Sequence, residues 1–238
     1  MNPESIDVTV VFLGKFSPAH TLLTELRKTK SLGTADLAEA YVKTVVDGQV
    51  AEVRFPWGAL VVGADRLQVS TQQVPYIRAS DLILKYVREI EPTARARALG
   101  INVRCIYRFL DGGDRDAVGV RLVPPLAWGS WGKEIEDSLN LPVTDASHGG
   151  MRTAVMRQGR PGKREGGWFD AKVQATGSPD SPLEVTIETN DHYEFPETLN
   201  PPPSIDDMSA RLVGRLENEF DISVLRSLNI ANGIVTGK

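Results

Sequence analysis

Apolar and polar residues alternate with a period of two through much of the first third of the chain. Between residues 51 and 57 every second side chain is apolar, while Glu52 and Arg54 lie on the opposite side, so a strand with one buried face is expected. Asp47-Gly48, directly before it, is a hairpin signal. The same criteria predict further strands at residues 6–13, 60–64 and 67–71.

Helical patterns flank these strands. Ser17 and Pro18 can begin a helix, with serine as the N-cap and proline at the first helical position, and Gly33 follows its expected end. Ser80 can begin a second helix, which Pro92 closes. The apolar positions of this second helix recur at i, i+4 and i+8: Leu82, Tyr86 and Ile90.

The second half repeats this order of elements with longer connections. A strand is expected at residues 101–110, a turn at 111–114, and a short helix from Ser130 whose inner face is Trp131, Ile135 and Leu139. Three strands and a final helix, opened by Ser204 and Asp207, complete the chain. The strands are expected at 151–158, 168–176 and 183–189, and the buried stripe of the helix comprises Ile205, Met208, Leu212, Leu216 and Phe220.

The element order predicts an α+β fold made of two pseudo-duplicated β-α-(β)n-α halves, residues 1–98 and 99–238, within one compact domain. Two such units most simply form one curved antiparallel sheet with the helices packed on one face. This order resembles the TATA-box-binding-protein-like, helix-grip architecture, whose two halves form a saddle. Separately, RALGINVRCIYRF, followed by a distant C-terminal amphipathic helix, resembles a sporadically distributed, uncharacterised family of bacterial proteins, which brings no established activity.

Composition places the chain among ordinary folded proteins. Of its 238 residues, 41% are apolar and 24% charged, which excludes disordered, collagen-like and coiled-coil classes. The single cysteine, Cys105, lies in a predicted strand and has no partner for a disulfide, so a reducing, cytoplasmic compartment is expected. MNPESIDVTV lacks the pattern of a secretory signal, and the longest apolar run, VTVVFLG, is too short to span a membrane.

No catalytic motif is recognisable. The chain lacks a G-x-S-x-G elbow, a phosphate-binding loop, a G-x-G-x-x-G turn and an H-E-x-x-H pair. His20, His148 and His192 are too scattered in sequence to form a spaced pair of metal ligands. We therefore expect no catalytic residue, no metal and no cofactor, and Cys105 is expected to pack in the core rather than to act as a nucleophile.

The most distinctive local feature is a basic hairpin within residues 157–168. Its cationic tip, flanked by glycines, lies between two predicted strands and next to an indole that could stack on bases. The alternative is a solvated hairpin tip whose glycines satisfy turn geometry. The residues expected to contact an anion or nucleic acid are Arg157, Arg160, Lys163, Arg164 and Trp168.

A second feature is Trp128-Gly129-Ser130-Trp131. Trp128 and Trp131 could form an exposed ridge that binds a partner, although packing of such rings in the core or at its rim is the more common arrangement.

These observations favour a non-catalytic, cytoplasmic protein-binding or adaptor module, with another protein or a second copy as its partner. The main reason is that a sheet with one uncovered face tends to acquire a cover. Nucleic-acid binding by the concave sheet and the basic hairpin is the alternative, although the net charge of −4 opposes it. A small ligand held between helices and sheet, as in helix-grip proteins, is a second alternative.

Overall fold

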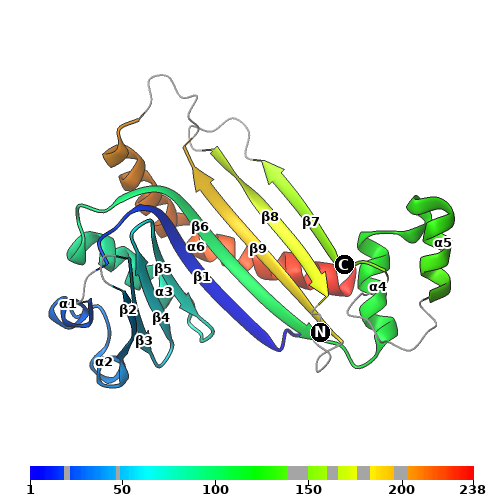
Figure 1. Cartoon of the computed structure of the whole chain (residues 1–238), viewed down its shortest axis with the longest axis horizontal. Coiled ribbons are helices and arrows are strands. Elements are labelled where there is room, and N and C mark those ends of the chain that lie inside the picture. Colours follow the sequence, from blue (N-terminus) through cyan, green and yellow to red (C-terminus); the bar gives the residue numbers. More distant parts are fainter. Residues whose placement is uncertain (19–21, 47–48, 139–149, 160–165, 176–182, 196–202) are drawn as a thin grey trace.

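The computed structural model describes residues 1–18, 22–46, 49–138, 150–159, 166–175, 183–195 and 203–238. Within these ranges nine strands form one antiparallel sheet in the order β2-β3-β4-β5-β1-β6-β9-β8-β7 (Figure 1). The strands are β1 (Ser5–Lys15), β2 (Tyr41–Val46), β3 (Val50–Phe55), β4 (Gly58–Gly63), β5 (Arg66–Thr71), β6 (Arg95–Arg108), β7 (Thr153–Gly159), β8 (Gly166–Ala175) and β9 (Glu184–Glu194).

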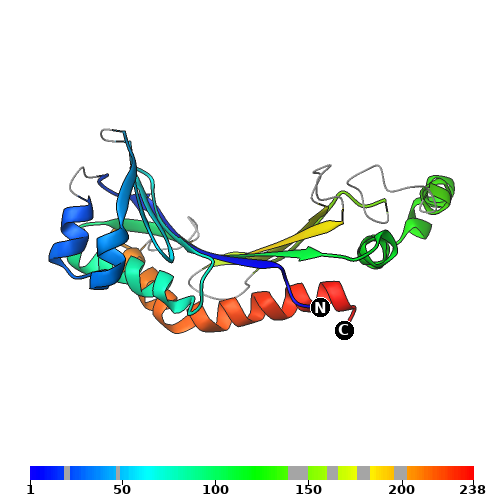
Figure 2. The same ribbon diagram turned by 90° about the horizontal axis from the view of Figure 1, so that it is seen from below.

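Among the described residues, helices cover one face of this sheet and leave the other open, so the fold is α+β with an open, curved sheet. The sheet curves like a saddle, and α3 and α6 lie beneath its convex side (Figure 2). The helices are α1 (Leu22–Lys28), α2 (Thr34–Glu39), α3 (Ile77–Lys85) with its π-helical continuation η1 (Tyr86–Ile90), α4 (Gly112–Leu122), the 3-10 turn η2 (Pro125–Trp128), α5 (Gly129–Ser138) and α6 (Ile205–Thr236).

The core lies between the sheet and these helices. In β1 the side chains of Val8, Val10 and Phe12 are fully buried, as the period of two requires when one face packs against helices. Leu212 and Leu216 lie on the buried stripe of α6, which packs mainly across β6. The expected alternation in β3 is also observed, because the apolar residues at 51, 53 and 55, with Trp57 just beyond the strand, are all buried.

Both halves place their last strand beside their first, since β5 pairs with β1 and β9 pairs with β6. β1 and β6 then pair with each other along the middle of the sheet, with one register shift next to Gly14. One sheet therefore contains the strands of both halves. That the halves are duplicated units stays a prediction.

Several local expectations are wrong. Residues 111–114 do not form a hairpin turn: Asp111 accepts a hydrogen bond from the backbone N–H of Asp114 (2.8 Å) and thereby begins α4. Ser80 does not open the second helix but is buried within α3. Ile205 is not part of the buried stripe of α6, because the first turn of that helix is exposed. Gly33 does not follow one continuous helix, since α1 ends at Lys28 and Gly33 is the N-cap of α2.

Other expectations fall outside the described residues. These are the hairpin signal at Asp47-Gly48, the last position of the expected helical face at Leu139, and two of the three histidines, His20 and His148.

None of the helices in the described ranges combines the length and the apolar character that a membrane crossing needs. The longest of them, α6, carries charged side chains along its outer face.

Candidate functional site

Polar side chains line the open, concave face of the sheet. Because opposed residues in neighbouring strands point to the same face, a row can be followed through the register of β8, β9, β6, β1 and β5. This row consists of Asp170, Asn190, Asn102, Thr9 and Ser70. The middle of the uncovered face therefore carries a row of polar side chains, with Val11 and Val155 beside it.

Cations on this face lie next to carboxylates. Arg104 and Lys172 lie 3.6 Å and 3.5 Å from the carboxylate oxygens of Glu188. At the other end of the sheet the Arg54 guanidinium contacts Glu52 at 2.9 Å. In these pairs the positive charges of Arg54, Arg104 and Lys172 are balanced by carboxylates, which weakens their attraction for phosphates.

A hollow of about 440 Å³ lies on the concave face between β1, β6, β9 and β8. Asn102, Asp170 and Asn190 contribute to its lining. The side-chain oxygen of Asn190 is buried beside this hollow and has no hydrogen-bond partner among the described residues.

Further hollows in the described part of the chain lie outside the layer between helices and sheet. One of about 530 Å³ extends over Tyr41, Arg54 and Trp57 in the first half of the molecule. Two more, of about 480 and 510 Å³, lie on the outer surface beside α3 and α6. The small-ligand site between helices and sheet stays a prediction.

Arg157, Trp168 and His192 stack across β7, β8 and β9. The Arg157 guanidinium lies 4.4 Å from the centroid of the Trp168 ring, and the His192 ring lies 4.1 Å from it at an interplanar angle of 24°. Arg157 lies on β7 and His192 on β9, so the two groups approach the indole from the two strands that flank its own. Stacking of a base on Trp168 would therefore require one of them to move.

Arg157 also forms an ion pair with Asp170. Its Nε and one terminal nitrogen each donate a hydrogen bond of 2.7 Å to the two carboxylate oxygens. This bidentate contact lowers the pKa of Asp170 below its ordinary value. The Arg157 guanidinium therefore binds the carboxylate of Asp170, and binding a phosphate would require it to give up this contact.

The structure brings together two of the five residues expected in the basic hairpin, Arg157 and Trp168. Arg160, Lys163 and Arg164 lie outside the described residues. His192 is a member of this cluster that the sequence prediction misses, because the strand expected at 183–189 continues through Asn190 and His192 to the end of β9. The alternation of apolar and polar residues in the strand expected at 183–189 would have predicted His192 if it had been continued a few residues further.

A helical arm built from η2 and α5 projects beyond the β7 end of the sheet (Figure 1). Trp128 and Trp131 form an edge-to-face pair with ring centroids 5.5 Å apart, and they are 52% and 56% exposed. Leu126 is 86% exposed in the same turn. Trp131 therefore does not form the buried inner face of α5 that the sequence predicts. We call Leu126, Trp128 and Trp131 the arm tip.

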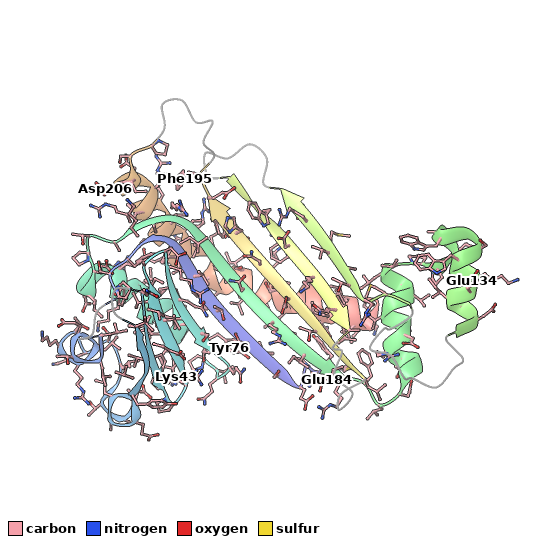
Figure 3. All side chains as sticks on the ribbon, viewed as in Figure 1. Lys43, Tyr76, Glu134, Glu184, Phe195 and Asp206 are labelled. Carbon is pink, nitrogen blue, oxygen red and sulfur yellow. The ribbon has the colours of Figure 1, made fainter. Side chains whose placement is uncertain are left out.

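Contacts at the base hold the arm in place. Arg121 in α4 donates hydrogen bonds to the carbonyl oxygens of Ile234 (3.2 Å) and Val235 (2.9 Å), which lie in the last turn of α6, where a helix leaves its carbonyl groups without helical partners. A Cβ on Gly132 would lie 1.8 Å from the Pro125 carbonyl oxygen, so only glycine permits α5 to fold back onto η2. Figure 3 labels Glu134 on α5, at the end of the molecule away from Lys43 in β2.

Comparisons with known proteins identify no family: no family model matches the chain, and no curated protein matches it. Function must therefore be inferred from the concave face and the arm tip themselves.

Proposed function

We propose that this protein is a non-catalytic protein-binding module of the cytoplasm, and that its arm tip is the surface that contacts the partner. The observation that carries this proposal is the Trp128–Trp131 pair, in which both rings are more than half exposed beside the exposed Leu126. Large aromatic side chains gathered on a projecting element are typical of protein interfaces, where tryptophan often dominates the binding energy.

The concave face is less suited than the arm tip to binding a protein. Arg104 and Lys172 lie beside Glu188 on this face, so burying these charges against a protein would bring a desolvation penalty. The arm tip, by contrast, gains free energy when its rings leave water. The partner is therefore expected on the arm rather than as a cover over the sheet.

A cytoplasmic location agrees with the state of Cys105. Its side chain is 1% exposed and unbridged, and burial raises the pKa of its thiol to about 11. Such a thiol is inert and serves core packing.

The test is quantitative capture of partners from the native cell with the wild-type protein and two double variants. Trp128→Ser/Trp131→Ser removes the arm-tip rings. Ile222→Ser/Leu225→Ser is the matched control, because these α6 side chains are 61% and 60% exposed and lie outside the arm. We expect at least one protein to be depleted about tenfold by the first variant, the loss typical of an interface hot spot, and unchanged by the control. Identical sets of captured proteins from all three baits would overturn the proposal.

One observation favours a second function, the binding of a polar small molecule in the concave hollow. The side-chain oxygen of Asn190, which has no partner among the described residues, would accept a hydrogen bond from a ligand with an N–H or O–H donor. Thermal-shift screening with nucleosides, sugars and amides tests it: a compound that raises the melting temperature of the wild type but not of Asn190→Ala is expected, and the absence of any such compound contradicts it.

A further inference from the structure

The sheet has two outer strands in the described part of the chain, and they differ in how well they are protected. β2 pairs with β3 through a register shift between Val42 and Thr44, and Lys43 lies at that shift. A bulge and a lysine are two of the devices by which proteins prevent edge strands from pairing with other chains. The β2 edge is therefore blocked.

β7 lacks these devices. It pairs with β8 through seven consecutive residues, from Thr153 to Gly159, with no register shift, and it contains neither proline nor lysine. Val155 on its concave side is 62% exposed, and Met156 on its helix side is 75% exposed. A regular strand with exposed apolar side chains on both faces is a template for a further strand.

We propose that a second copy of this chain adds to this edge, with β7 pairing antiparallel to β7 of the second copy across a two-fold axis. This surface is separate from the arm tip and does not depend on its function. The two sheets would then form one continuous sheet whose concave faces lie on the same side. Because the second copy's side chains must keep to their own face, the axis lies midway between one residue and its own copy, and this residue is either Met156 or Val155.

Charge and closure both favour a second copy as the occupant. With the axis at Met156, that side chain meets its own symmetry mate, and Val155 lies opposite the second copy's Arg157. Arg157 is neutralised by Asp170 on the neighbouring strand, so no uncompensated like charges face each other. Since only one of the two described edges is unblocked, pairing closes after two copies instead of continuing into a filament.

The edge is also held in position for pairing. Arg226 in α6 donates a hydrogen bond of 3.0 Å to the side-chain oxygen of Gln158, which fixes the far end of β7 from beneath. This hydrogen bond helps to order one end of β7 in the single chain, which lowers the entropy that is lost when a second strand pairs with it.

The first test is light scattering and sedimentation equilibrium at micromolar protein concentration. We expect a dimer, and we expect Val155→Lys/Met156→Lys to raise its dissociation constant about tenfold or more, because lysines are brought opposite each other or opposite Arg157. Val42→Lys/Val46→Lys on β2 is the matched control and leaves the dimer intact. All four positions are exposed, so the variants keep the fold, which circular dichroism verifies.

The second test uses cysteine cross-linking and locates the axis. Directly opposed residues in antiparallel strands have Cα atoms about 4.5–5.5 Å apart, within the range of a disulfide. We expect oxidation to give a covalent dimer with Met156→Cys or with Val155→Cys, but not with Val42→Cys. Cys105 does not interfere, because its buried thiol is not accessible.

A monomer at these concentrations, with no covalent dimer from either β7 cysteine, would overturn the proposal. A dimer that survives the lysine substitutions in β7 but is lost with Trp128→Ser/Trp131→Ser would also overturn it and would place self-association on the arm tip instead. A dimer lost only with the β7 substitutions supports it.

Discussion

The cluster of Arg157, Trp168, Asp170 and His192 shows how single residues set the character of the concave face. One guanidinium covers an indole face and binds a carboxylate through two hydrogen bonds at once. Such a bidentate contact satisfies both partners within the protein. The described residues that most resemble a nucleic-acid clamp therefore bind one another, and a clamp would depend on the basic residues among positions 160–165, which lie outside the described residues.

Acid pH is expected to remove the contribution of the Arg157–Asp170 pair. The pKa of Asp170 is lowered in the folded protein, so its contribution to the free energy of unfolding is present above the unfolded-state pKa of about 3.9. This contribution is lost as the pH falls through the lowered pKa. The wild type should thus exceed Asp170→Asn in stability near neutral pH, and the difference should shrink below about pH 4.

Urea unfolding at a series of pH values measures this difference. Asp221→Asn, which changes an exposed carboxyl of α6, is the control and should follow the wild type. A constant gap between the wild type and Asp170→Asn across the series would show that the carboxylate contributes nothing through its charge.

Gly167, at the start of β8, is required by its backbone geometry. Its φ is +118°, and a Cβ there would lie 2.1 Å from the His192 carbonyl oxygen. Gly167→Ala is therefore expected to lower the free energy of unfolding by about 2–4 kcal/mol through backbone strain and a steric clash. At Gly159, on the other side of the same hairpin, an added Cβ would meet no atom within 4 Å, so Gly159→Ala should cost about 0.5 kcal/mol or less. Equal effects of the two substitutions in urea denaturation would contradict this expectation.

At the scale of elements, the sequence predicts the strands well because their alternation is regular. β3 and the middle of β1 follow the expected pattern of one buried face. The missed elements have physical reasons. The segment Asp111-Gly112-Gly113-Asp114 carries the residues of both a turn and a helix N-cap. Tertiary contacts of the residues that follow, such as buried Val118 and the hydrogen bonds of Arg121 to the end of α6, favour the helix.

The candidate site is predictable only in part. Arg157 and Trp168 are recognisable from the sequence, because a basic hairpin beside an indole is unusual. Their pairing with Asp170 and His192 depends on which strands are neighbours, and a single sequence does not reveal that order. For Trp131 the sequence leaves two alternatives open, an exposed ridge with Trp128 or a buried helical face, because its spacing to Ile135 is the spacing of such a face.

Two serines on the buried stripe of α6 supply a test of the helix packing. Ser223 and Ser227 are 1% and 0% exposed, and their hydroxyl groups have no hydrogen-bond partner among the described residues. Ser227→Ala should therefore raise the free energy of unfolding by about 1 kcal/mol, since it removes a buried unsatisfied group and increases helix propensity.

Ser209 in the same helix provides the contrast. Its hydroxyl accepts a hydrogen bond of 3.3 Å from the backbone N–H of Ala96, so Ser209→Ala should destabilise the protein by about 1 kcal/mol. Thermal unfolding of the two variants should shift in opposite directions. A loss of stability in Ser227→Ala would show that its hydroxyl is satisfied.

For the whole molecule, the curved sheet separates two kinds of surface. The middle of the concave face carries polar side chains and ion pairs, while the arm tip and the β7 edge lie toward the same end (Figures 1 and 2). Exposed apolar side chains also occur on β2 at the other end, among them Tyr41, Val42 and Val46, but the arm tip presents two neighbouring indole rings. Protein partners are therefore expected to bind through the arm tip and not through the concave sheet.

The most direct test titrates a captured partner, purified, against three forms of the protein by calorimetry. These are the wild type, Trp128→Ser/Trp131→Ser on the arm tip, and Asn102→Ala/Asn190→Ala on the concave face. We predict that the arm-tip variant weakens binding about tenfold or more, equivalent to at least about 1.4 kcal/mol, whereas the concave-face variant binds as the wild type does. Loss of binding in the concave-face variant, with the arm-tip variant unaffected, would contradict the proposed role of the arm.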